Sequence, residues 1–153
     1  IRFDGEHYLN DNTILHSVLP VIQWIDDRQR NIQKPVLFIS LSDRIINHSS
    51  GFAKSVAALA VGYDVHIVAG VPYNTPELCQ KVVDWCEANL GVPVWNRVTI
   101  TNHKNLLLAD YLIDAEPEVN GAPDFMGTLI HFGSDAFKSW EDVLSYFDRL
   151  GGQ

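Results

Sequence analysis

The sequence is poor in cysteine, methionine and basic residues. Its 153 residues include two cysteines, one methionine and 11 lysines and arginines, against 19 aspartates and glutamates. Cys79 and Cys86 fall two turns apart on one expected helix, too far apart for a disulfide, and they have no partners for a zinc site. We therefore expect two reduced thiols and a cytoplasmic protein.

The shortage of positive charge narrows the classes of partner. The formal net charge is −8, so the surface is not built to neutralise the phosphates of a nucleic acid, and we expect no nucleic-acid partner. Long apolar runs are lacking too. None approaches the roughly 18 to 20 residues that cross a bilayer, so we expect no membrane partner.

The histidines do not predict a metal site. None of them shows the paired or four-residue spacing that metal ligands on one helix face would have. They are His7, His16, His48, His66, His103 and His131. We expect most of them to be surface or hydrogen-bonded core residues.

Strand-like and helix-like stretches alternate from residue 34 onward. Apolar runs predict five strands, at residues 36–41, 64–69, 97–100, 111–114 and 127–132. Helical spacing predicts helices at residues 52–62, at 75–90 and after Ser139, and Asn102 is expected to cap a brief helix through Leu108. This alternation is typical of a doubly wound, Rossmann-like α/β domain, a parallel sheet flanked by helices, over residues 34–153.

Residues 1–33 are expected to form a separate, partly helical N-terminal extension. Apolar residues recur there at helical spacing, namely Ile14, Val18, Ile22 and Ile25, while Pro20 must kink the helix or begin its main part. The α/β domain does not require this stripe. Trp24, Ile22 and Ile25 are therefore our candidate surface for a protein partner.

The second half of the chain carries an ordered set of motifs. They are the strand at residues 65–70, Lys104, the segment 109–117, and residues 127–133 with the following Trp140. In this order they resemble the haloacid dehalogenase-like (HAD-like) superfamily, and within it the 5'(3')-deoxyribonucleotidase branch of phosphatases. The resemblance implies that the first motif falls at Ser40 and Ser42, at the end of the first strand.

The resemblance also implies that the chemistry of this branch is lost. In the superfamily a carboxylate at the first motif attacks phosphorus, and a second one two residues later acts as acid and base. Ser40 and Ser42 hold these positions here. A serine hydroxyl is neither ionised near neutral pH nor a strong ligand for a hard divalent cation.

Two further motif positions are changed. Ala69 stands where the second motif presents a hydroxyl, and Ala115 replaces one of the paired acids that hold Mg²⁺ in the fourth motif. Lys104 and Asp114 remain from the full set, and we expect Asp114 alone to bind Mg²⁺ poorly. We therefore expect no catalytic residue and no cofactor.

Lys104 allows two interpretations. It is either a solvated helix residue or, with Ser40 and Ser42, part of a site that attracts an anionic ligand. Residues 44–63 leave room for little more than one helix, so we also expect no cap domain over the cleft. A triad of Ser40, His48 and Asp114 lacks the glycines of a nucleophile elbow, and we do not favour it.

Three functions are compatible with these observations. The first is an inactive HAD-like domain that binds a protein partner or a phosphorylated ligand. The alternative is a Mg²⁺-dependent 5'(3')-deoxyribonucleotidase or related phosphoric monoester hydrolase, in which Asp43 or Asp114 has taken over a displaced role. The third is a structural, oligomer-forming subunit.

Overall fold

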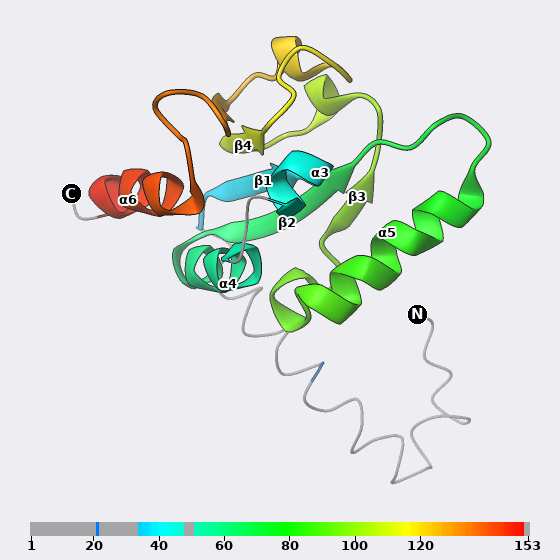
Figure 1. Ribbon diagram of the computed structural model, residues 1–153, viewed down its shortest axis with the longest axis horizontal. Helices are drawn as coiled ribbons and strands as arrows, with labels where there is room; N and C mark the ends of the chain where they lie inside the picture. The colour runs from blue at the N-terminus through cyan, green and yellow to red at the C-terminus, as the bar shows by residue number, and fades with distance from the viewer. Residues whose placement is uncertain (1–20, 22–33, 48–50, 152–153) are drawn as a thin grey trace, which may run out of the picture. The chain divides into compact units, whose positions relative to one another are not determined.

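A computed structural model of the chain describes residue 21 and residues 34–47 and 51–151 (Figure 1). The residues from Pro35 onward form one compact unit. The expected N-terminal helix, with its surface at Trp24, Ile22 and Ile25, lies outside the described residues and stays a prediction. Among the residues that are described, no helix is long and apolar enough to cross a membrane.

The core of the unit is a five-stranded parallel sheet in the order β3-β2-β1-β4-β5. The strands are β1 (Val36–Ser40), β2 (Asp64–Ala69), β3 (Val98–Ile100), β4 (Tyr111–Asp114) and β5 (Thr128–His131). The expected doubly wound, Rossmann-like fold is confirmed. Each predicted strand is found, and β2 and β4 have the predicted bounds.

The strand order places the site. From β1 the chain moves outward through β2 to β3, then crosses back to β4 on the other side of β1 and continues to β5. The order therefore reverses between β1 and β4. In such sheets ligands bind at the carboxyl edge beside this switch point, where Ser40 and Asp114 end their strands.

Helices and turns connect the strands. The α-helices are α3 (Asp43–Asn47), α4 (Phe52–Gly62), α5 (Pro76–Asn89) and α6 (Trp140–Gly151). The 3₁₀ turns are η1 (Val92–Val94), η2 (Lys104–Leu106) and η3 (Ala122–Asp124). The first turn of α5 shows why it begins where it does, because Pro76 presets the backbone and Glu77 faces the positive end of the helix dipole.

The prediction of a brief helix from Asn102 to Leu108 is wrong. Only the 3₁₀ turn η2 forms there, and Leu107 after it is extended. Asn102 does not cap η2, which begins after His103, and its side-chain amide donates to the Val71 carbonyl oxygen at 2.8 Å. That bond joins the loops after β2 and β3.

The two faces of the sheet are covered differently. Side chains alternate along β1, so Leu37 and Ile39 join the core formed with α3, α4, α5 and α6, while Phe38 points the other way. Phe38, Val68 and Leu112 pack against Ala122 and Phe125 of the η3 region. In Figure 1, α4 and α5 lie below the sheet and α6 lies to its left, while η2 and η3 lie above it.

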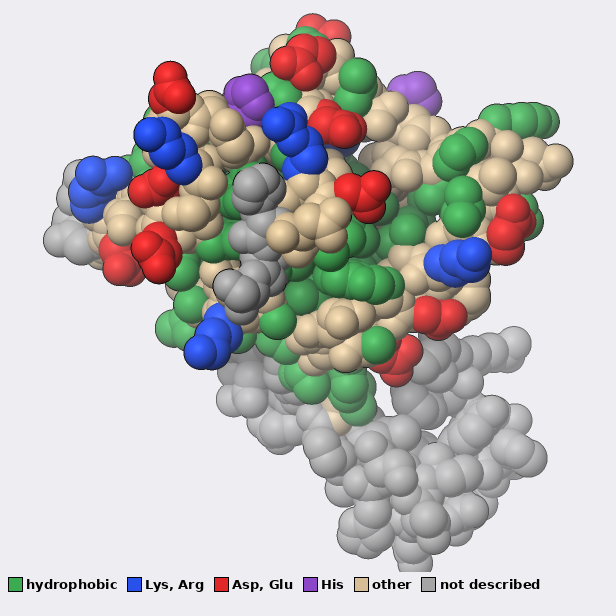
Figure 2. Space-filling model, in the orientation of Figure 1, with side chains coloured by type: hydrophobic (Ala, Val, Ile, Leu, Met, Phe, Trp, Pro, Cys, Tyr) green, Lys and Arg blue, Asp and Glu red, His purple; other side chains and the backbone are tan. Residues whose placement is uncertain are grey.

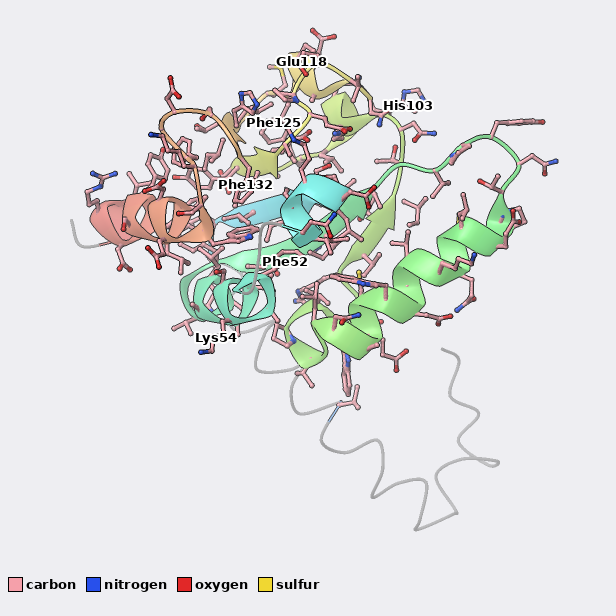
Figure 3. The ribbon with its side chains drawn as sticks, viewed as in Figure 1. Phe52, Lys54, His103, Glu118, Phe125 and Phe132 are labelled. Atoms are coloured by element: carbon pink, nitrogen blue, oxygen red, sulfur yellow. The ribbon has the colours of Figure 1, made fainter. Side chains whose placement is uncertain are left out.

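Helix α4 shows how the sequence pattern builds the thicker layer. Phe52, Val56 and Leu59 are buried, and Phe52 stacks on Trp140 of α6 with ring centroids 5.2 Å apart. Figure 3 shows Phe52 between α4 and the sheet, with Lys54 pointing away from the sheet. The apolar stripe of the helix therefore fixes its orientation over β1 and β2.

Candidate functional site

Several strand ends and loops meet at the carboxyl edge of the sheet. Ser40 ends β1, Ala69 ends β2 and Asp114 ends β4. Lys104 begins η2, in the connection that leads from β3 to β4. Because all the strands are parallel, these ends lie on the same edge.

Lys104 links the two central strands at this edge. Its Nζ donates to Asp114 Oδ2 at 2.5 Å and to Ser40 Oγ at 3.3 Å. The Lys104 and Asp114 side chains are only 4% and 1% exposed. The structure therefore contains a buried ion pair with a serine hydroxyl as its third member.

The second oxygen of Asp114 is also occupied. Asp114 Oδ1 accepts a hydrogen bond from the Glu116 amide at 2.8 Å. One oxygen thus faces an ammonium and the other a backbone N–H, both of which stabilise the ionised carboxylate. This arrangement accounts for a charged group at 0% exposure.

The loop that presents Lys104 is shaped by asparagines and glycines. The Lys104 amide donates to the Asn120 carbonyl oxygen at 2.7 Å. Asn120 and Gly121 both have positive φ, 53° and 79°, and an added Cβ at Gly121 would collide with the Asn105 side chain. This close approach of η2 to η3 turns the lysine inward.

Ser42 has a different role from Ser40. Its Oγ accepts a hydrogen bond from the Ile45 amide at 3.4 Å, the geometry of a helix N-cap, and Asp43 occupies the first turn of α3. Arg44 donates to the Ala115 carbonyl oxygen at 3.5 Å. Ser42 therefore supports α3, and Asp43 is exposed to solvent.

The other predicted site residues fall at the edge or outside the described part of the chain. Ala69 and Ala115 are 4% and 2% exposed, so their methyl groups pack at the strand ends. His48 lies outside the described residues. Within residues 34–47 and 51–151, no group of three or more histidine, cysteine, aspartate or glutamate side chains comes together as a metal site.

The groups with shifted pKa values lie away from this edge. Burial raises the pKa of the Cys86 thiol to about 11, and burial, followed by the charge of neighbouring groups, raises the pKa of Tyr63 and of Tyr111. Cys86 is neutral at physiological pH and inert as a nucleophile. Both cysteines are free thiols, as expected.

Comparison with known proteins identifies the relationship. No family model matches the chain. Over 105 residues it is 35% identical to a protein of Vibrio phage KVP40 named "Putative 5'(3')-deoxyribonucleotidase". The chain belongs to the HAD-like superfamily. The match covers 67% of this chain and 61% of the phage protein, so the chain spans less than two thirds of the length of that relative.

The HAD-like family implies Mg²⁺, and the donor set at this edge does not fit it. Mg²⁺ requires several oxygen ligands in near-ideal octahedral geometry and is usually held by one or two carboxylates. Asp114 has both oxygens engaged by N–H donors, Ser40 Oγ faces an ammonium, and Ala115 offers no side-chain oxygen. A cation bound here would have to displace Lys104.

The ion pair itself has no signal in the sequence. Neither interpretation of Lys104, a solvated residue or an anion site, foresaw a lysine that is 3% exposed and turned toward Asp114. A charged residue in a short loop is usually solvated. Only the close packing of η2 on η3 shows where the ammonium goes.

Proposed function

We propose that this HAD-like chain works by binding and does not hydrolyse phosphate esters. The observation that carries the proposal is the buried contact of Lys104 with both Ser40 and Asp114. It supports the motif register that the resemblance implies, since Ser40 lies beside the two residues retained from the family's set.

Ser40 is poorly suited to replace a carboxylate nucleophile. A serine hydroxyl attacks only when a nearby base accepts its proton. The neighbour within hydrogen-bond distance is Lys104, whose ammonium donates to Asp114 and so has no lone pair to offer. Among residues 34–47 and 51–151, attack on phosphorus at this position therefore lacks a base.

The burial of the ion pair favours a protein partner over a phosphorylated ligand. A phosphate bound by Lys104 would have to displace Asp114 from a 2.5 Å contact and reach an ammonium that is almost fully buried. Breaking such a pair leaves a buried charge uncompensated. The exposed surface of the domain is the more accessible place for a binding function.

Phosphate release tests this proposal directly. The full chain is incubated with a panel of 5'- and 3'-deoxyribonucleotides, with Mg²⁺ and with a chelator. We expect no Mg²⁺-dependent phosphate above the level of a heat-inactivated sample. Turnover that requires Mg²⁺ and disappears in Asp114→Asn would contradict the proposal.

A Mg²⁺-dependent nucleotidase is the second candidate, because the phage relative is named a putative 5'(3')-deoxyribonucleotidase. Asp43 is the acid that could serve it, since it is exposed and lies three residues after Ser40. In that case Asp43→Asn would abolish turnover. Equal activity of Asp43→Asn and the unchanged chain would remove this candidate.

A further inference from the structure

In the turn η2 and the residues after it, a charged side chain is buried and apolar side chains are exposed. Lys104 points inward at 3% exposure, whereas Leu106 and Leu108 are 76% and 96% exposed. Leu107 between them packs against the smaller apolar core, on the face of the sheet that η3 covers. The extended backbone at Leu107 puts the two flanking leucines on the same, outward side.

Met126 extends this apolar surface. An added Cβ at Gly127 would lie 2.6 Å from the carbonyl oxygens of Ala109 and Asp110, so the two segments pack backbone against backbone. Leu108 and Met126 are the residues just before this contact, and Met126 is 90% exposed. We call Leu106, Leu108 and Met126 the η2 apolar patch.

The stretch of chain that carries the η2 apolar patch is acidic. From residue 98 to residue 137, Lys104 is the one lysine or arginine, and it is buried and paired. The exposed acids of the same stretch are Asp110, Glu116, Glu118, Asp124 and Asp135. Figure 2 shows acidic and apolar side chains next to each other at the top of the view, where Figure 3 places Glu118.

We propose that the η2 apolar patch docks a basic, amphipathic segment of another protein. Aliphatic side chains of the segment would cover the three exposed residues, and its lysines or arginines would meet the surrounding carboxylates. A nucleic acid would be repelled by these acids. A second copy of the chain, docked patch to patch, would place the same acids of the two copies opposite each other, where they would repel.

This inference gives a partner class to the binding role proposed above, but it does not depend on the loss of catalysis. Peptide binding and phosphate release are separate measurements on the same full-length chain. An active enzyme with an intact patch would overturn the proposed function alone. An inactive chain that fails to bind would overturn the docking surface alone.

The test uses two labelled helical peptides of about 18 residues, long enough to form a helix on a surface. One is built from leucine and lysine, and the other carries glutamate at every lysine position. Fluorescence anisotropy with the full chain should show binding of the leucine-lysine peptide that weakens as salt is added. Equal binding of both peptides, or of neither, would overturn the proposal.

Matched variants locate the binding. Leu106→Ser/Leu108→Ser/Met126→Ser should weaken binding about tenfold or more, because it removes the apolar contacts. The control Val61→Ser/Tyr73→Ser changes two residues that are equally exposed elsewhere, at 78% and 95%, and should leave affinity unchanged. Equal loss in both variants, or in neither, would contradict the assignment.

A charge variant tests the contribution of the exposed acids in the stretch that carries the η2 apolar patch. Glu116→Gln/Glu118→Gln/Asp124→Asn should weaken binding by several-fold and flatten its salt dependence, since these carboxylates supply the attraction. Sedimentation of the free chain completes the test. Self-association that the serine variant abolishes would make a second copy the occupant and would overturn the choice of a basic partner.

Discussion

Replacing Lys104 by methionine should destabilise the domain by about 3–4 kcal/mol. Removing one partner of a buried ion pair typically costs about 3–5 kcal/mol, because the remaining charge is left uncompensated. Here the Glu116 amide still donates to Asp114 Oδ1, which favours the lower half of that range. The 3.3 Å bond to Ser40 Oγ is lost in the same substitution, and its contribution is included in this range.

The double variant separates the ion pair from simple packing. In Lys104→Met/Asp114→Asn both charges are gone, and the asparagine oxygen can still accept from the Glu116 amide. Its cost should be smaller than the sum of the two single variants by about 2 kcal/mol or more, the signature of two groups in direct contact. Asp114→Asn alone should cost about as much as Lys104→Met, since it leaves the ammonium buried.

Urea unfolding followed by far-UV circular dichroism measures these differences. Lys54→Met is the control, because Lys54 is an exposed lysine on α4 that points away from the sheet (Figure 3), and it should change the free energy of unfolding by no more than about 0.5 kcal/mol. A cost below about 1 kcal/mol for Lys104→Met, or strict additivity in the double variant, would refute the buried pair.

Three further predictions concern groups away from the strand edge. Burial raises the pKa of Cys86 from 9.0 to about 11 in the folded protein. The neutral thiol therefore contributes stability that is fully present below pH 9. This contribution, about 2–3 kcal/mol, is lost as the pH rises from about 9 to 11. Cys86→Ala in a Cys79→Ser background should remove that part of the pH dependence of unfolding, and an unchanged slope would count against it. Trp140 Nε1 is buried with no acceptor in the described structure, so Trp140→Phe should cost no more than about 1 kcal/mol in urea unfolding despite the smaller ring, and a much larger cost would mean that the N–H is bonded. Gly127→Ala places a Cβ 2.6 Å from two backbone oxygens and should cost at least about 2 kcal/mol, whereas Gly62→Ala meets nothing within 4 Å and should be neutral or slightly stabilising in thermal unfolding.

Most of the sheet could be predicted from local sequence. Interior parallel strands are apolar on both faces, so residues 64–69 and 111–114 read as largely apolar runs and become β2 and β4 without change. The helix at residues 75–90 carries its own start signal in Thr75 and Pro76. In these segments local preference and tertiary packing agree.

The segment from Asn102 to Leu108 is where the prediction failed, because long-range contacts override local preference there. Asn102 is a good cap in isolation, but its amide binds Val71, 31 positions earlier in the chain. Leu107 then turns inward under η3. A brief helix would have to give up both contacts.

The site was predicted in part. The resemblance implies that Ser40, Lys104 and Asp114 are motif positions, and the structure brings these three into contact. Their burial could not be predicted, because it depends on Asn120 and Gly121 adopting positive φ beneath η2. A single sequence shows the glycine but not what packs against it.

The central claim is that the carboxyl edge of this sheet has lost the groups that attack phosphorus and hold Mg²⁺. It is tested most directly by restoring them in Ser40→Asp/Ser42→Asp/Ala115→Asp and measuring phosphate release from deoxyribonucleotides beside the unchanged chain. The account predicts Mg²⁺-dependent turnover in the restored variant and none in the unchanged chain. Mg²⁺-dependent turnover by the unchanged chain, at a rate that the three substitutions do not raise, would contradict it.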